Sequence, residues 1–123
     1  MEVEQAMACI GDRRGPVWHG RLVRRWKGSF SSVEFDWGWA MRREEEKGDV
    51  LGFYHTHPGG LERPSARDVR TMQAWSSCFG KPLLCIIRCD KGLTAFVFRG
   101  DRSEPVQLGT VELFPRNVIV AVE

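Results

Sequence analysis

The chain has 123 residues, 42% of them hydrophobic and 28% charged, which is enough apolar material for the core of one domain over residues 1–123. Its 18 basic and 16 acidic residues leave a formal net charge of +2, too balanced for a typical nucleic-acid-binding protein. No apolar run approaches the roughly 20 residues of a transmembrane helix, and the first residues lack the pattern of a signal peptide. We therefore expect a cytoplasmic protein that binds neither membranes nor nucleic acids.

The four cysteines, Cys9, Cys78, Cys85 and Cys89, lie in or next to apolar segments and lack the paired spacing of a disulfide framework. Reduced thiols are the default in a cytoplasmic chain. Cys85 and Cys89 could share one strand face and bind a metal. We favour the simpler interpretation, that they are two small core residues.

The first half of the chain predicts two strands, over 3–10 and 17–25, separated by turn residues at 12–16. A third short strand is expected over 32–35. Asp36 can cap a helix that runs to about Lys47 and ends at Gly48. Trp37 and Met41 are four residues apart and are expected to face the core.

In the second half, residues 49–57 are apolar at successive positions, which is typical of a strand buried on both faces at the centre of a sheet. A Pro/Gly-rich loop follows, and Ser65 begins a second helix that runs to about Cys78, before Gly80 and Pro82. Strands over 82–89 and 93–99 are expected to form a hairpin, followed by strands between 106 and 113 and over 118–122. The result is an α/β or α+β domain with a mixed, mostly antiparallel sheet and two helices.

The residues with the clearest chemistry lie between the central strand and the second helix. His55 and His57 are two apart on the strand, so both imidazoles can reach one point. Asp68 follows on the first turn of the next helix, and the intervening loop can fold it back onto the histidines. Two neutral imidazoles and a carboxylate make a good zinc site, and three protein ligands leave the fourth position for water, as in catalytic zinc sites.

Each part of this pattern also has a simpler interpretation. His-x-His occurs on many strands without any function, and Ser65 with Asp68 alone is a capping box of the helix. His19 has no acidic or histidine neighbour and is expected on the surface. The conjunction of His-x-His-Pro at a strand end with Ser-x-x-Asp at the next helix start favours the metal site.

This conjunction resembles the JAMM motif of the MPN-plus zinc isopeptidases: His55-Thr56-His57-Pro58, six residues, then Ser65-Ala66-Arg67-Asp68. The likeness covers most of the chain. It implies the cytidine deaminase-like α/β fold of the MPN domain, a mixed β-sheet flanked by helices. It also implies one catalytic zinc ion held by His55, His57 and Asp68, with Ser65 helping to stabilise the tetrahedral intermediate.

The family also uses an upstream glutamate as general base and acid, before a short apolar strand that ends in glycine. Glu4 fits this position, seven residues before Gly11, although the glycines common inside the family's segment are replaced here. Glu2 is the alternative, and a surface glutamate without a catalytic role is the simpler interpretation. Glu34 and the acidic cluster at 44–46 lie in the wrong region.

The resemblance implies hydrolysis of the isopeptide or peptide bond after the C-terminal tail of ubiquitin or a ubiquitin-like protein. The chain resembles the compact prokaryotic members, which are often encoded beside ubiquitin-like proteins and homologues of ubiquitin-activating and ubiquitin-conjugating enzymes. Three alternatives stay open: a peptidase that trims a sulfur-carrier or ubiquitin-like precursor, a non-catalytic MPN scaffold, and a DNA-associated protein of the related RadC type.

Two further features concern partners. Most family members carry a helix before the glutamate, whereas only three residues precede Glu4. Either the fold manages without that helix, or a second chain or subunit covers the exposed face. The segment 26–41 is rich in Trp and Phe, and in relatives the corresponding region helps to bind the extended tail of the ubiquitin-like protein. The same aromatic residues could equally belong to the core.

Overall fold

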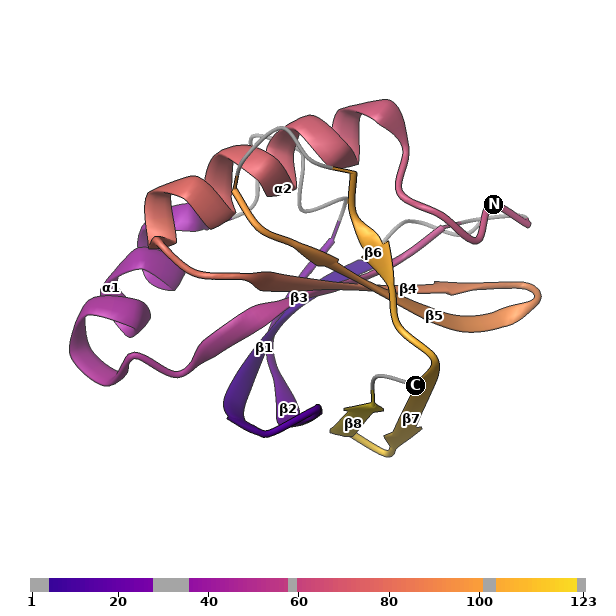
Figure 1. Ribbon diagram of the computed structural model, residues 1–123, viewed down its shortest axis with the longest axis horizontal. Helices are drawn as coiled ribbons and strands as arrows, with labels where there is room; N and C mark the ends of the chain where they lie inside the picture. The colour runs from indigo at the N-terminus through magenta and orange to yellow at the C-terminus, as the bar shows by residue number, and fades with distance from the viewer. Residues whose placement is uncertain (1–4, 28–35, 58–59, 101–103, 122–123) are drawn as a thin grey trace.

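The computed structural model describes residues 5–27, 36–57, 60–100 and 104–121 (Figure 1). The strand expected over 32–35, together with Glu2 and Glu4, lies outside these residues. In chain order the elements are β1 (Gln5–Arg14), β2 (Val17–Lys27), α1 (Trp37–Lys47), β3 (Val50–Thr56), α2 (Ala66–Phe79), β4 (Leu83–Cys89), β5 (Gly92–Phe98), β6 (Val106–Gln107), β7 (Thr110–Phe114) and β8 (Asn117–Ala121).

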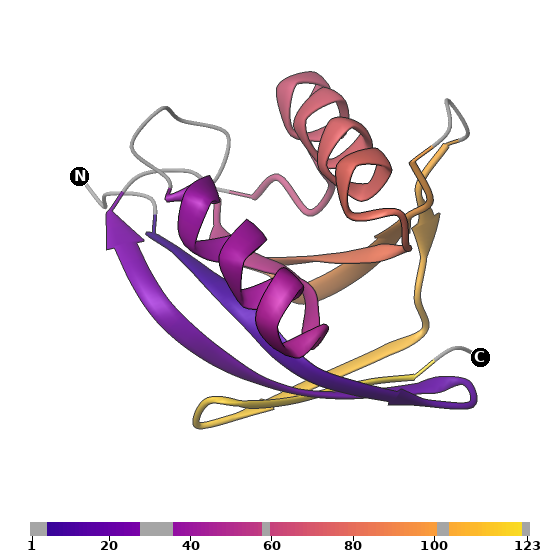
Figure 2. The same ribbon diagram turned by 90° about the vertical axis from the view of Figure 1, so that its left-hand side faces the viewer.

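The strands form one curled sheet in the order β6-β5-β4-β3-β1-β2-β8-β7. β3 and β4 pair in parallel because α2 carries the chain back across the sheet between them, while the other described pairs are antiparallel. Both helices lie on the same side of the sheet (Figure 2). The predicted mixed, mostly antiparallel sheet with two helices is confirmed, and so is the central position of the strand that carries the histidines.

Helix α1 begins and ends where its capping residues predict. The Asp36 side chain accepts a hydrogen bond of 3.0 Å from the backbone N–H of Trp39, and Gly48 ends the helix in a left-handed conformation. Trp37 packs against the core as expected, but the fully buried residue of the helix is Ala40 rather than Met41. The small Ala40 side chain allows the helix to lie close to the sheet.

The sheet separates two hydrophobic cores. Between the sheet and the helices lie Phe53, Met72 and Phe98, and the opposite face buries Trp18, Leu22 and Val120 inside the curl. Strand β3 contributes to both cores, which explains its continuous apolar sequence.

The described tryptophans belong largely to the helix-side core. Trp37 stacks on Trp75 of α2 with 4.0 Å between ring centroids and meets Phe53 edge-on, and Trp26 meets Trp39 edge-on at 6.1 Å. The core interpretation of these residues is therefore confirmed, while Phe30 and Phe35 lie outside the described residues.

All four cysteines are free thiols, with Cys9 and Cys85 completely buried and Cys78 exposed. In the parts of the chain that the structure describes, no helix is long and apolar enough to cross a bilayer.

Candidate metal centre

Three side chains converge at the end of β3, on the side of the sheet that carries the helices. The Nε2 atoms of His55 and His57 lie 2.7 Å apart, and Oδ2 of Asp68 lies 3.2 Å from the first and 3.0 Å from the second. The exposed fractions of the three residues are 0%, 7% and 3%, so the group is screened from bulk water. Among the described residues, this is the one group of three or more side chains whose donor atoms lie close enough to share a metal ion.

The local folding explains why these residues meet. His55 and His57 have the same parity along the strand, and Asp68 is the third residue of α2, whose first turn faces the strand end. The backbone N–H of His57 donates to the carbonyl of Arg88 on β4 at 2.8 Å, which extends the strand pairing past Thr56. The sheet itself therefore holds the second histidine in place.

The donor set fits zinc. Two imidazole nitrogens and one carboxylate oxygen are ligands that zinc accepts at about 2.0–2.2 Å, which corresponds to separations of roughly 3.3–3.6 Å around a tetrahedral ion. The observed separations of 2.7, 3.0 and 3.2 Å are close to these values. A small outward movement of the side chains would accommodate the ion.

The proton on His57 gives a second argument for a cation. Its Nδ1 lies 3.1 Å from the carbonyl oxygen of Leu61, which can only accept a hydrogen bond, so Nδ1 carries the proton. In the neutral imidazole, Nε2 then presents its lone pair to Oδ2 of Asp68, which is also an acceptor. Two acceptors at this distance repel each other unless a metal ion or a proton lies between them.

Asp68 supplies the negative charge of the group. Burial by itself raises the pKa of its carboxyl, but the imidazoles of His55 and His57 beside Oδ2, together with a hydrogen bond from the backbone N–H of Ser65, lower the pKa by more. The net result is a pKa below the ordinary range, so the carboxylate is ionised at neutral pH.

The capping box and the proposed ligand role coexist in the structure. Oγ of Ser65 accepts from the backbone N–H of Asp68 at 3.1 Å, and Oδ2 of Asp68 accepts from the backbone N–H of Ser65 at 3.1 Å. Ser65 is half-buried at the edge of the group. The serine therefore orients the carboxylate that faces the histidines.

Sequence reasoning missed the backbone groups that support the site. The carbonyls of Leu61 and Arg88 fix the ring and the main chain of His57, yet any residue supplies a carbonyl, so no sequence signal identifies them. The hydroxyl of Thr56 was missed as well: it accepts from the backbone N–H of Gln5 at 2.9 Å and ties β1 to the end of β3, a contact that exists only once the two strands pair.

The other candidate residues from the sequence are two glutamates, His19 and the cysteines. Glu4 and its alternative Glu2 lie outside the described residues. His19 is exposed on β2, as expected, in a separate cleft away from the metal centre. Burial raises the pKa of Cys9 to about 12 and that of Cys85 well above its ordinary value. Neither thiol is therefore a nucleophile at neutral pH.

A cleft of about 360 Å³ lies next to the loop that precedes α2. Glu62, Pro64 and Val69 form one side of it, and Phe96 and Gln107 form the other. Leu61, whose carbonyl bonds His57, is 45% exposed.

A curled mixed sheet with two helices on one side and a buried His-His-Asp group defines a metallo-hydrolase of the JAMM/MPN class. A family model of prokaryotic homologues of the JAB domain matches residues 2–99, and the chain belongs to this family. This match confirms the resemblance deduced from the motif. No curated protein matches the chain significantly.

Proposed function

We propose that the protein is a zinc-dependent isopeptidase or peptidase that hydrolyses the amide bond after the C-terminal tail of a ubiquitin-like protein. The observation that supports it most is the convergence of His55, His57 and Asp68 in one buried group. In this group the lone pair of His57 Nε2 faces the carboxylate of Asp68, an arrangement that a cation between them stabilises. Zinc held there would supply a Lewis acid and a water molecule of lowered pKa.

In this proposal Glu4 is the general base and acid. Ala6 of β1 lies opposite His55, and Glu4 precedes Ala6 by two residues, the spacing that places side chains on the same face of a strand. Glu4 would accept the proton of the attacking water and return it to the leaving amine. The hydroxyl of Ser65 would donate a hydrogen bond to the oxyanion.

The substrate class is proposed from the family and the shape of the site. The cleft beside the loop that precedes α2 suits an extended tail, and a tail ending in Gly-Gly would suit narrow access to the buried group. Partners would be the ubiquitin-like protein or its conjugates, homologues of ubiquitin-activating and ubiquitin-conjugating enzymes, and a second chain near the amino terminus. Intact ligands argue against a non-catalytic scaffold.

The test combines metal analysis with cleavage of two substrates. A ubiquitin-like protein ending in Gly-Gly is joined either to a lysine ε-amine or, in a linear fusion, to an α-amine. We expect about one zinc ion per chain and cleavage that stops with a chelator and in His57→Ala. Cleavage of the linear fusion alone would favour the precursor-trimming peptidase, and zinc binding without any cleavage would contradict the proposal.

A further inference from the structure

A second cleft opens on the other face of the sheet, behind the metal centre. Its volume is about 450 Å³, and its wall carries three arginines from different elements: Arg25 on β2, Arg88 on β4 and Arg116 in the turn between β7 and β8. All three are exposed. Met7, Leu22 and Leu113 contribute apolar surface to the same cleft, and none of the described residues that line it is acidic.

The three arginines have no carboxylate partner among the described residues. The ion pairs of the structure use other arginines, such as Arg24 with Asp36 and Arg43 with Asp49. Within the described part of the chain, positive charge is therefore concentrated at this cleft and no carboxylate neutralises it, which favours an anionic ligand.

A β-bulge directs Arg25 into the cleft. The pairing of β1 with β2 shifts by one residue between Met7 and Ala8, and the extra residue is Arg24, the one non-glycine residue with positive φ (57°) in the described chain. The bulge places Arg25 opposite Met7, on the face of the sheet that carries the cleft. Strained backbone of this kind is concentrated at functional sites.

The cleft is also connected to the metal centre. Arg88 is the register partner of Thr56, the residue between the two histidines, and its carbonyl holds the backbone of His57. Tyr54, which precedes His55, lies in the cleft lining. The arginine cleft and the histidines thus lie on opposite faces of the sheet, next to the end of β3.

We propose that this arginine cleft binds an acidic segment of the protein substrate, with carboxylates on Arg25, Arg88 and Arg116 and apolar side chains on the floor between them. Guanidinium groups bind carboxylates in a bidentate geometry. Their distribution over three elements suits several charges along an extended chain rather than one compact anion. The inference that the bound segment belongs to a substrate rests on the proposed function. The inference that the segment is acidic rests on the arginines of the cleft alone.

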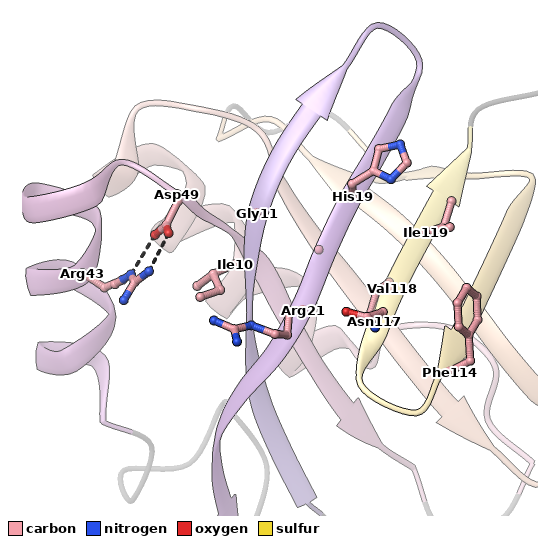
Figure 3. Close-up of a pocket in the computed structure, with 11 residues that line it drawn as sticks. Ile10, Gly11, His19, Arg21, Arg43, Asp49, Phe114, Asn117, Val118 and Ile119 are labelled. Carbon is pink, nitrogen blue, oxygen red and sulfur yellow. Dashed lines mark hydrogen bonds and ion pairs between the residues drawn. The ribbon is translucent and has the colours of Figure 1, made fainter.

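A different cleft, in which an arginine is paired with a carboxylate, provides the control for the binding experiment. It lies between α1 and the β2–β8 region and contains Arg21 and His19, but also the ion pair between Arg43 and Asp49 (Figure 3). Arg21 is exposed, like the arginines of the proposed site. Arg21→Gln therefore removes the same charge from the protein without touching the arginine cleft.

The experiment measures binding of a fluorescent peptide of alternating Glu and Leu by anisotropy, using the full chain. We expect the double variant Arg25→Gln, Arg88→Gln to bind the peptide at least about tenfold more weakly than the parent protein does. Arg21→Gln should bind it as tightly as the parent. A control peptide with Gln in place of Glu should bind the parent protein as weakly as the Glu peptide binds the double variant. Arg88→Lys, which keeps the charge, should retain part of the affinity. Thermal unfolding of each variant checks that it is folded.

Several results would overturn the inference: equal binding by the double variant, the same loss in Arg21→Gln, or displacement of the peptide by a lower concentration of a single-stranded oligonucleotide. The assay requires no hydrolysis, so it is separate from the proposed function. Peptide binding without cleavage of conjugates would support the proposed acidic-peptide site and contradict the proposed enzymatic function. Cleavage without peptide binding would support the enzymatic function and contradict the acidic-peptide site.

Discussion

Ser65 and Asp68 each accept a hydrogen bond from the other's backbone N–H, both at 3.1 Å. The oxygen of Asp68 that closes this capping box is also the oxygen that lies 3.2 Å and 3.0 Å from the two histidine rings. The start of α2 and the metal centre therefore share an atom. Any change to the cap alters the orientation of a proposed metal ligand.

The first prediction concerns this shared cap. Ser65→Ala should lower the free energy of unfolding by about 1 kcal/mol, because an N-cap is lost. It should also weaken zinc binding roughly tenfold, because Asp68 is less firmly oriented. Urea unfolding of the metal-free protein and a zinc titration measure the two effects separately. In the proposed function turnover falls further still, and full turnover in a folded Ser65→Ala protein would leave the serine with a capping role alone.

A matched control exists in the other helix. Asp36→Ala removes the N-cap of α1, whose side chain accepts from Trp39, and should cost a similar free energy of unfolding. Zinc affinity should stay at the parent value because Asp36 is not part of the metal group. If both variants lost zinc affinity equally, general destabilisation rather than orientation of Asp68 would explain the effect.

The second prediction concerns stabilisation by zinc. A free zinc concentration of 100 times Kd should raise the free energy of unfolding by about 2.7 kcal/mol, because the ion binds the folded chain. Unfolding curves with and without zinc measure this increase, which His57→Ala should abolish. His19→Ala serves as the control, since His19 lies in a separate cleft and its removal should leave the increase intact. Stoichiometric zinc in the double variant His55→Ala, His57→Ala would refute the assignment.

The sequence was most informative where local rules act. The capping residues of both helices and the parity of His55 and His57 on one strand are short-range features, and the structure confirms them. The burial of Ala40 instead of Met41 was missed, because the choice depends on how closely α1 approaches the sheet. A periodicity of apolar residues does not specify that distance.

Features that depend on the conformation of a loop or on distant segments could not be predicted. The carbonyl of Leu61 and the register of Thr56 with Arg88 arise only when the loop and the parallel strand pair are in place. The bulge at Arg24 could not be predicted from the sequence either, since arginine has no special preference for a left-handed backbone. The arginine cleft therefore emerges from the three-dimensional arrangement alone.

The third prediction concerns the close contact of the parallel pair. A Cβ atom on Gly52 would clash with the carbonyl oxygen of Leu84 and would lie 2.6 Å from its nitrogen, both backbone atoms of β4. Gly52→Ala should therefore push the two strands apart and cost at least about 2–3 kcal/mol of unfolding free energy. Denaturant unfolding measures the loss, and zinc affinity should fall with it because His57 is held by the same strand.

Gly15→Ala is the comparison for Gly52. Gly15 lies in the turn between β1 and β2 with φ of 60°, and a Cβ atom there would meet nothing within 4 Å. The substitution should cost only about 1 kcal/mol, from the left-handed backbone conformation. Equal losses at the two positions would show that steric contact with β4 is unimportant.

The last prediction concerns Glu4, proposed as the general base. Glu4→Gln keeps the size of the side chain and removes its basicity, so zinc should stay bound while hydrolysis falls by roughly 100-fold to 10,000-fold. The variant should still bind its substrate and could trap the uncleaved conjugate. Cleavage rate and zinc content, measured side by side on the same preparations, provide the readout.

Glu2→Gln is the control for that experiment, and it should behave like the parent protein. Ala6 lies opposite His55, and both glutamates have the parity of Ala6, so the strand pattern alone does not choose between them. Glu4 is favoured because it is the nearer of the two in sequence to Ala6, the residue opposite His55. An inactive Glu2→Gln with an active Glu4→Gln would assign the base to Glu2. Activity in both variants would place the base elsewhere, either in another residue of this chain or in a second chain bound near the amino terminus.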